Sequence, residues 1–421
     1  MENITKPELL APAGDMEKLR VALAYGADAV YLAAQRFSLR ANAKNFDEAA
    51  LAEAVAYTHA LGKKLYVTVN IYAHNEDLEG LPAYFKTLAE IGADAAIVSD
   101  PGVFMLARQA APGLDLHIST QANTTNAQSV LFWQSLGAAR IVLARELSLN
   151  EIAAIRARIT PPESTSPKEG IELEAFVHGA MCMSYSGRCL LSSYLTGRDA
   201  NRGDCAQACR WGYAVSEATR PGDYMPIEED ARGTYIFNAR DLCMIEHIPA
   251  LLSASIDSLK IEGRMKTPYY VGVVVKAYRQ ALDDFFTSPA LYESKKSHYL
   301  TELEKASHRP FGAGFFFGKP GADEQVYGNS SYVRTYDFIG MVKEYDPSTQ
   351  MALVEQRNRF VMGEEVELLQ SRGQGFTQVL SQIYDLEGRL IQAAPHAQQL
   401  VRIPVAQPVA PLDMLRRAVL S

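Results

Sequence analysis

The sequence predicts a (β/α)₈ TIM-like barrel, an α/β fold of eight parallel strands surrounded by helices, followed by a small C-terminal β-barrel domain. Three times a helical stretch ends at Gly-Ala and a short apolar run follows: GADAVYLAA from Gly26, GADAAIVSD from Gly92 and GAARIVLAR from Gly137. Runs that are apolar on both faces are typical of parallel strands covered by helices. Similar runs bring the number of expected strands to eight, and their alternation with helical stretches favours a barrel over an open sheet.

The expected strands occupy the first two thirds of the chain. They lie at residues 8–14, 26–34, 65–70, 92–100, 116–121, 137–145, 172–179 and 258–264. Between them, Asp15 is placed to cap a helix that Gly26 ends, and Asp100 followed by Pro101 is a typical start of another helix. No G-x-G-x-x-G follows the first strand, so a dinucleotide site at that turn is not expected.

The length of the chain and a change in its sequence pattern predict two domains. A chain of 421 residues exceeds what one core usually supports. We expect a barrel domain over 1–310, a linker over 311–330 and a small β-barrel over 331–421, where short alternating runs such as DFIGMVKEYDP and MALVEQRNRF appear between turns. The seventh strand is followed by a cysteine-rich insertion over 180–245, which should lie over the end of the barrel that carries the chemistry.

Composition narrows the class of protein. The opening MENITKPELLAPAG lacks a basic segment followed by an apolar run, and no stretch has the length of a membrane span, so we expect a cytoplasmic protein. The net charge of -8 argues against binding nucleic acid through overall charge and leaves room for a local basic patch.

Four of the five cysteines lie close together between His178 and Tyr213. Their spacing is C-x6-C-x15-C-x3-C, at Cys182, Cys189, Cys205 and Cys209. In a reducing compartment such a cluster indicates metal binding or catalysis. The C-x2-C pairs of structural zinc sites are missing, and four thiolates on a long loop suit a [4Fe–4S] cluster.

Other interpretations of the cysteines stay open. The fifth, Cys243, has apolar neighbours and is expected in the core, although it could replace one of the four ligands. His178 lies four residues before Cys182, so a Cys–His nucleophile of a peptidase is an alternative. Serine and HExxH peptidase motifs are absent from the sequence.

Polar residues at or near the carboxyl ends of the expected strands outline a charged pocket, because barrel enzymes place their sites there. They are Asn70, Asp100, Gln121, Arg145, Glu174, His178, Lys260, Glu262 and Arg264. Helix capping and mutual pairing at the rim are the alternative roles. We assign Glu174, His178, Lys260 and Glu262 as candidate catalytic residues, and Asn70, Gln121, Arg145 and Arg264 as candidate substrate-binding residues.

The run EAFVHGAMCMSYSGRCLLS from Glu174 resembles the signature of the collagenase-like peptidase family of unknown catalytic type. GRDANRGDCAQACRWGY, KIEGRMKTPYYV and ELLAPAGDMEKLRVALAYGADAVYLA are similar to the same family, so the resemblance covers nearly the whole chain. It implies bacterial hydroxylation of tRNA, of ribosomal RNA or, for shorter paired members, of a ubiquinone precursor. The chain length and the tail point to the branch that forms 5-hydroxyuridine at the wobble position of tRNA. A collagenase-like peptidase and a ubiquinone-pathway accessory protein are the alternatives.

The resemblance also implies cofactors and partners. It implies an iron–sulfur cluster on Cys182, Cys189, Cys205 and a fourth cysteine, which the C-x-x-x-C pair assigns to Cys209 because the alternative position carries Ala231; Cys243 is the reserve. Prephenate is implied as the oxygen source, and Arg145, Lys260 and Arg264 could bind such a dicarboxylate. The tRNA anticodon loop would present the base unstacked. The insertion's arginines could neutralise nearby phosphates: Arg188, Arg198, Arg202 and Arg210. The tail is expected to dock RNA, and a role in packing or dimerisation is the alternative.

Overall fold

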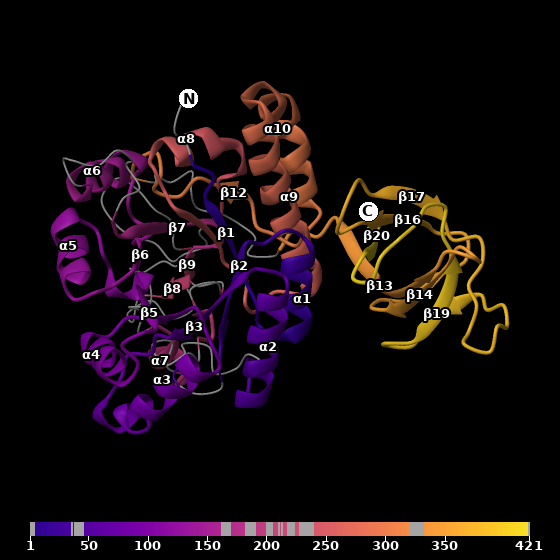
Figure 1. Cartoon of the computed structure of the whole chain (residues 1–421). Coiled ribbons are helices and arrows are strands. Elements are labelled where there is room, and N and C mark those ends of the chain that lie inside the picture. Colours follow the sequence, from indigo (N-terminus) through magenta and orange to yellow (C-terminus); the bar gives the residue numbers. More distant parts are fainter. Residues whose placement is uncertain are drawn as a thin grey trace.

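The computed structural model of the chain consists of a large helical and stranded body and a smaller all-β body beside it (Figure 1). It describes residues 5–34, 37, 46–160, 170–181, 191–198, 205–208, 211, 214–216, 224–226, 240–319 and 332–419. No helix in these ranges is both long and apolar enough to cross a bilayer.

Eight parallel strands form a closed barrel, which confirms the predicted fold class. The strands are β1 (Glu8–Pro12), β2 (Ala29–Ala33), β3 (Lys64–Val69), β4 (Ala95–Val98), β5 (Asp115–Ile118), β6 (Arg140–Val142), β7 (Glu172–Ala180) and β11 (Ser258–Ile261). Closure depends on β11, which pairs in parallel with the first strand and the seventh, so that Ser258 lies opposite both Glu8 and Glu174. Because β11 pairs with both β1 and β7, the eight barrel strands close on one another without a free edge between the first and the last.

Helices cover the outside of the barrel. They are α1 (Met16–Ala24), α2 (Glu48–Ala60), α3 (Leu81–Glu90), α4 (Pro101–Ala110), α5 (Ala127–Ser135), α6 (Leu149–Ile159), α8 (Ile248–Ser253), α9 (Pro268–Thr287) and α10 (Pro289–Glu304), with 3₁₀ turns η1 (Asn75–Leu78), η2 (Thr120–Ala122) and η5 (Ile245–His247). Asp15 and Asp100 cap α1 and α4 as expected, because their carboxylates accept from the backbone N–H groups of Lys18 and Val103, each at 2.9 Å.

The cysteine-rich insertion follows the seventh strand, as predicted. Its described elements are α7 (Leu191–Thr196), β8 (Ala214–Ser216), β9 (Tyr224–Pro226) and β10 (Asp241–Cys243). The carboxyl end of β7 extends past the barrel and pairs antiparallel with β10, with Gly179 opposite Leu242. β10 also pairs with β12 (Phe311–Gly312), so residues at the start of the expected linker belong to the barrel sheet. The insertion is therefore anchored at both ends on β7.

Two glycines allow close backbone approach beside the carboxyl ends of the strands. A Cβ on Gly14 would lie 2.1 Å from the carbonyl oxygen of Arg264. A Cβ on Gly179, whose φ is +112°, would lie 2.8 Å from the carbonyl oxygen of Glu262. Only glycine fits at these distances, so β1 and β7 pack tightly against the turn that follows β11.

The inside of the barrel holds a chain of buried ion pairs. Arg140, 3% exposed, contacts Glu8 at 2.6 Å and Glu174 at 3.0 Å, and Glu174, with no exposed surface, also contacts Lys260 at 2.6 Å. Arg140 makes a further contact with Glu172 at 2.6 Å. Each charge has an opposite partner, which is the condition under which charges are tolerated inside a protein.

The C-terminal domain is a curved six-stranded antiparallel sheet with its own apolar core (Figure 1). Its strands, in the order of the sheet, are β17 (Phe376–Val379), β16 (Glu365–Leu369), β20 (Met414–Ala418), β13 (Tyr336–Asp346), β14 (Met351–Gln356) and β19 (Leu400–Pro404); a separate pair joins β15 (Phe360–Val361) to β18 (Ala393–Ala394). The Gln378 side chain links the two edges by donating to Pro404 O at 2.9 Å and accepting from Ala406 N at 2.8 Å. The sheet therefore curls into a half-barrel.

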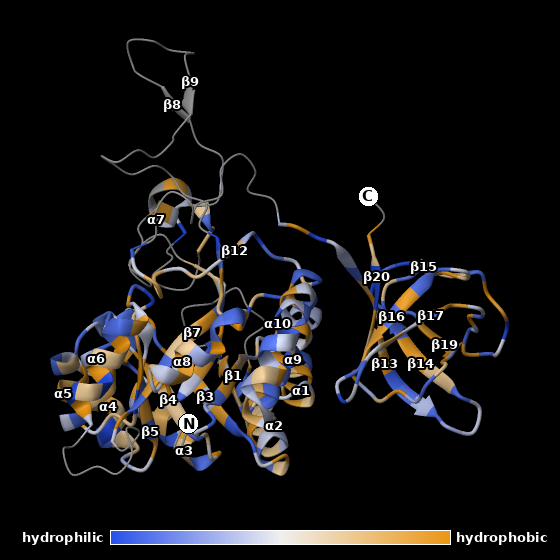
Figure 2. Ribbon diagram, turned by 90° about the horizontal axis from the view of Figure 1, so that it is seen from above, coloured by the Kyte–Doolittle hydropathy of each residue, from blue (hydrophilic) through white to orange (hydrophobic). Residues whose placement is uncertain are grey.

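The two domains touch through polar contacts from α1, α9 and α10. Tyr25 donates its hydroxyl to carbonyls of the C-terminal domain, with O–O distances of 3.0 Å to both Leu369 and Leu412. Arg416, 1% exposed, pairs with Glu302 of α10 at 2.6 Å and with Glu367 of its own domain. Figure 2 shows the C-terminal domain beside α1, α9 and α10 of the barrel. These contacts fix the domain relative to the barrel.

Replacing Arg416 by methionine tests this interface. Arg416→Met keeps an apolar stem and removes the guanidinium group, so Glu302 and Glu367 are left facing each other with Lys305 as their shared cation. We therefore expect the free energy of unfolding to fall by about 3 kcal/mol. Urea unfolding of the full chain, followed by circular dichroism, measures the change.

Arg389→Met is the matched control. Arg389 pairs with Asp385 and Glu387 in the same domain, but its side chain is 72% exposed. An equal loss of stability in both variants would contradict a special role for the buried arginine.

Candidate functional site

The carboxyl ends of the strands form a mouth lined by charged and amide side chains. Arg264, 5% exposed, follows β11 and donates to the Thr68 hydroxyl of β3 at 3.2 Å. Its backbone oxygen accepts from Lys18 of α1 at 3.4 Å. Arg264 is thus held from two sides, and the mouth carries a fixed guanidinium group next to the third strand.

A second guanidinium, that of Arg145 after β6, lies over the ring of Phe176, with its Cζ atom 3.8 Å from the ring centroid. It donates to Ala180 O at 2.8 Å and lies 3.9 Å from the Glu262 carboxylate. Its Nε atom is buried and finds no hydrogen-bond partner in the part of the chain that the structure describes. The contact with Phe176 and the bond to Ala180 hold the guanidinium in place, which favours recognition of a carboxylate or phosphate.

Glu262 is held opposite Arg145 by a tyrosine. The Tyr31 hydroxyl of β2 lies 3.2 Å from Glu262 Oε2 and 3.0 Å from Ile261 O. The Lys260 ammonium lies 4.5 Å from the centroid of the Tyr31 ring. Glu262 therefore remains at the mouth, with 12% of its side chain exposed.

Two amides complete the mouth on the side of β3 and β5. Asn70 Nδ2 donates to Gln121 Oε1 at 3.2 Å and approaches Ser119 Oγ at 3.5 Å, while the Ser119 hydroxyl also donates to Gln121 Oε1. The backbone carbonyl of Asn70 accepts from Ser99 at 3.2 Å. The structure thus brings the predicted residues Asn70, Gln121, Arg145, Glu262 and Arg264 to one end of the barrel. Asp100 instead caps α4.

Glu174 and Lys260, expected at the mouth, lie deeper inside the barrel. Both are buried, and each is paired within the chain of ions that Arg140 completes. Burial opposes ionisation of Glu174, but the charges of Lys260 and Arg140 outweigh it and lower the pKa of this carboxyl. A carboxylate with no exposed surface and a cation beside each oxygen is enclosed away from a substrate, so its position favours a structural role.

His178 points away from the mouth, into an aromatic cluster on the outside of β7. Its ring contacts those of Tyr270, Tyr278 and Phe311 at centroid distances of 5.5–6.0 Å, and it is 2% exposed. Burial, aided by the charges of Lys266 and His308, lowers the pKa of His178 to about 3. A neutral, enclosed imidazole of this kind is a poor candidate for proton transfer with a substrate.

Two of the five cysteines lie among the described residues, and their surroundings differ. Cys205 is exposed and free, and its sulfur accepts the backbone N–H of Gln207 at 3.3 Å. Cys243 is buried beside Tyr278, and burial raises the pKa of its thiol to about 12. Since the thiolate is the form that binds metals, this position disfavours Cys243 as a ligand. The remaining candidates, Cys182, Cys189 and Cys209, lie outside the described residues.

Of the insertion arginines, Arg198 is exposed after α7. Arg188, Arg202 and Arg210 lie outside the described residues.

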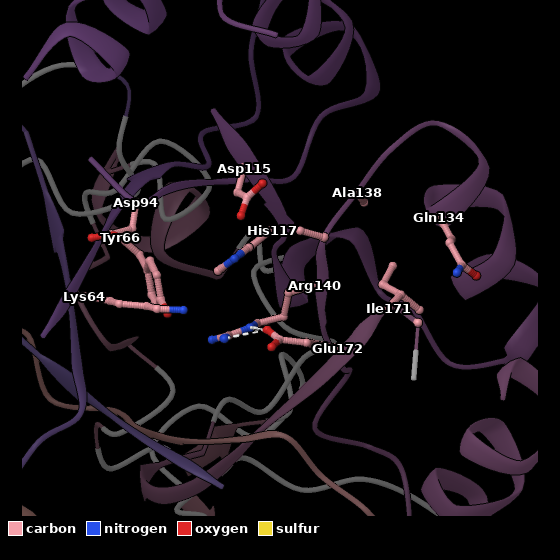
Figure 3. A pocket seen from close by; sticks show the side chains of 12 residues that line it. Lys64, Tyr66, Asp94, Asp115, His117, Gln134, Ala138, Arg140, Ile171 and Glu172 are labelled. Carbon is pink, nitrogen blue, oxygen red and sulfur yellow. Dashed lines mark hydrogen bonds and ion pairs between the residues drawn. The ribbon is translucent and has the colours of Figure 1, made fainter. Parts of the chain in front are cut away.

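A cavity of about 430 Å³ lies at the opposite, amino end of the barrel strands. Figure 3 shows the paired side chains of Arg140 and Glu172, with Lys64, Asp115 and His117 around the same space. Barrel enzymes carry their chemistry at the other end, and polar groups at this end usually serve stability. We interpret this cavity as the solvent-facing side of the buried ion pairs.

Sequence reasoning missed four side chains of the site and its support: Tyr31, Thr68, Ser119 and Arg140. Tyr31, Thr68 and Ser119 lie within or directly after apolar runs, where a hydroxyl looks like part of a core. The alternation of side chains along a strand could have identified them. Thr68 lies two residues after Tyr66 and Ser119 two after His117, so each pair shares the inner face, and Tyr31 lies opposite Tyr66.

The chain matches the family model described as Peptidase family U32 over residues 14–326 and the model described as Peptidase family U32 C-terminal domain over residues 334–416. Among curated relatives, it is 41% identical to "tRNA hydroxylation protein P1" of Bacillus subtilis, covering 98% of this chain and 95% of the relative. It is 39% identical to "tRNA hydroxylation protein P" of Escherichia coli, covering 96% and 94%.

A relative with a different name is "Collagenase" of Porphyromonas gingivalis, 30% identical over 99% of this chain and 98% of that protein. Among solved structures, the C-terminal domain of a U32 peptidase from Geobacillus thermoleovorans is 42% identical, covering 19% of this chain and 99% of that one, with a TM-score of 0.19.

Glu174 and Glu262 are predicted to respond differently to the same substitution. Glu174→Gln leaves Lys260 without its buried partner, so we expect the free energy of unfolding to fall by about 3 kcal/mol. Glu262→Gln keeps an oxygen for the Tyr31 hydroxyl and loses a charge that lies 3.9 Å from Arg145, so it should cost less than about 1 kcal/mol. Urea titrations of the two variants measure both values, and equal losses would contradict the assignment of Glu174 to the core.

His178 should make stability depend on pH. Its pKa in the folded chain, about 3, lies below the ordinary value of 6.5, so the unfolded chain binds one more proton between these values. The stability that neutral His178 contributes is fully present above pH 6.5 and is lost as the pH falls towards 3, at about 1.4 kcal/mol per pH unit.

His178→Phe should remove this part of the slope while keeping an aromatic ring in the cluster. Urea midpoints between about pH 5 and pH 7 measure it, since this window lies around the ordinary histidine pKa. The same slope in the variant and the parent would show that the imidazole is already accessible to protons.

Proposed function

The chain belongs to peptidase family U32, and from this premise we propose that it is a tRNA hydroxylase that forms 5-hydroxyuridine at the wobble position. The observation that carries the proposal is the similarity, over nearly the full length of both chains, to relatives named tRNA hydroxylation proteins. The C-terminal domain contributes as well, because its contacts with the barrel would hold docked RNA at a fixed position relative to the mouth.

The mouth has groups suited to a nucleotide and to an acidic co-substrate. Arg145 and Arg264 are planar cations that can each take a carboxylate or a phosphate through two parallel hydrogen bonds. Asn70 and Gln121 carry amide donors and acceptors of the kind that read base edges. This combination supports an unstacked uridine of the anticodon loop as substrate and prephenate, a dicarboxylate, as the oxygen source.

Hydroxylating an unactivated ring carbon calls for a redox-active or Lewis-acidic centre. We propose that Cys182, Cys189, Cys205 and Cys209 would hold a [4Fe–4S] cluster, which would supply that chemistry. Cys205 fits a ligand role, because it is exposed and its sulfur already accepts a backbone N–H, a contact typical of cluster thiolates. Cys243 fits less well, because it is 8% exposed and packs within the apolar core of the barrel domain.

The arrangement of His178 weighs against a peptidase with a Cys–His nucleophile. Its ring packs between β7 and α9 with 2% exposure, so a peptide carbonyl has no access to it. A general base must reach within hydrogen-bond distance of the group it deprotonates. The position of His178 therefore gives no support to a peptidase activity of this chain, although one relative is named "Collagenase".

Gene replacement tests the proposal. In a bacterial strain lacking its own members of this family, the wild-type chain should restore 5-hydroxyuridine in tRNA, measured by mass spectrometry of nucleosides. Cys205→Ala should abolish the product and the bound iron, since one ligand of the cluster is lost.

Cys243→Ala is the matched cysteine control and should retain both the product and the iron. No restoration by the wild-type chain would refute the proposed function. Iron lost from Cys243→Ala but kept in Cys205→Ala would refute the ligand assignment.

A further inference from the structure

Asn70 and Gln121 have a fixed orientation at the mouth. Gln121 Oε1 accepts from both the Asn70 amide and the Ser119 hydroxyl. The turn that carries Gln121 is fixed too, because its backbone oxygen accepts from Asn123 Nδ2 at 3.0 Å and from the Tyr72 hydroxyl at 3.4 Å. The structure thus holds both amides with Gln121 Oε1 turned towards the Asn70 amide and the Ser119 hydroxyl.

Among the described residues, this orientation leaves one acceptor atom and one donor atom of the two amides without a hydrogen-bond partner. Asn70 Oδ1 is buried and accepts no hydrogen bond from the described residues. Gln121 Nε2 likewise donates to no residue within the described ranges, because the contacts of its side chain run through Oε1. Asn70 is 6% exposed, so it is held in an enclosed site, and a buried acceptor without a partner costs about 1–3 kcal/mol unless a ligand supplies the donor.

We infer that Asn70 Oδ1 and Gln121 Nε2 read the base edge of the substrate, accepting from N3–H and donating to O4 of a uracil ring. This inference rests on the proposed function. It adds the two atoms that select the base. Uracil carries a donor at N3 beside an acceptor at O4, whereas cytosine carries an acceptor at N3 and a donor at N4, so cytosine in the same position would oppose both protein groups.

The geometry of the base suits this assignment. O4 is attached to C4, the direct neighbour of C5, so reading this edge fixes the ring close to the atom that is hydroxylated. Sites that bind a polar edge with buried groups reject analogues that lack it far more strongly than apolar pockets do. Ser119 is a positioning residue in this scheme, because its hydroxyl helps to set the Gln121 amide.

Binding of three anticodon stem–loop RNAs tests the inference. They carry uridine, 3-methyluridine or cytidine at the wobble position, and fluorescence anisotropy measures their affinity for the holoprotein. Wild type should bind the uridine RNA roughly tenfold more tightly than either of the others, since 3-methyluridine lacks the N3–H donor. Asn70→Ala should bring the ratio close to one.

Gln134→Ala removes an amide at the other end of the barrel and should retain the wild-type ratio. In the gene-replacement strain, Asn70→Ala should lower 5-hydroxyuridine by roughly tenfold at unchanged iron content, whereas Gln134→Ala should not. A ratio of one for wild type, or an unchanged ratio for Asn70→Ala, would overturn the inference, and the wild-type measurement does not depend on the folding of any variant.

Failure of the inference and failure of the function are distinguishable. If wild type restores 5-hydroxyuridine but does not discriminate among the three RNAs, only the assignment of Asn70 and Gln121 is wrong. If wild type does not restore it, the proposed function is wrong.

Discussion

The barrel depends on the guanidinium of Arg140 and the carboxylates around it. Arg140 on β6 contacts Glu8 on β1 and Glu174 on β7, and Glu174 in turn contacts Lys260 on β11. These strands include the first and the last of the barrel, so the ion pairs fasten it from inside at the seam where it closes. A buried charge without an opposite partner is costly because it has lost its water. The four charged side chains, Arg140, Glu8, Glu174 and Lys260, therefore stabilise the barrel as a set.

The position of the mouth follows from this interior arrangement. Lys260 and Glu262 are two residues apart on and after β11, so the strand that places an ammonium inside also carries a carboxylate to the mouth. Phe176 stands between the two levels, with Arg145 3.8 Å and Lys260 5.3 Å from its ring centroid. Phe176 thus lies between the charges that stabilise the barrel and the charges at the mouth.

Much of this architecture could be predicted from the sequence, and the limits have physical causes. Apolar runs after Gly-Ala turns identified the strands, and Asp15 and Asp100 identified two helix starts. The sequence does not predict how far below the mouth a side chain lies along the barrel axis. Glu174 and Lys260 lie inside the barrel because strand length and register set their position along this axis. The register shift between Lys260 and Ile261, together with the extension of β7 onto β10, turns His178 to the outer face. Alternation along the sequence does not reveal such a shift.

Two kinds of buried polar group therefore occur in one barrel. The ions around Arg140 are matched within the protein, and removing one leaves an uncompensated charge. At the mouth, Asn70 Oδ1 and Arg145 Nε are buried without partners among the described residues. A fold tolerates such atoms at a cost in stability, and a ligand that supplies the missing bonds returns that free energy as affinity. The stable interior thereby permits a mouth that keeps buried polar atoms without partners among the described residues.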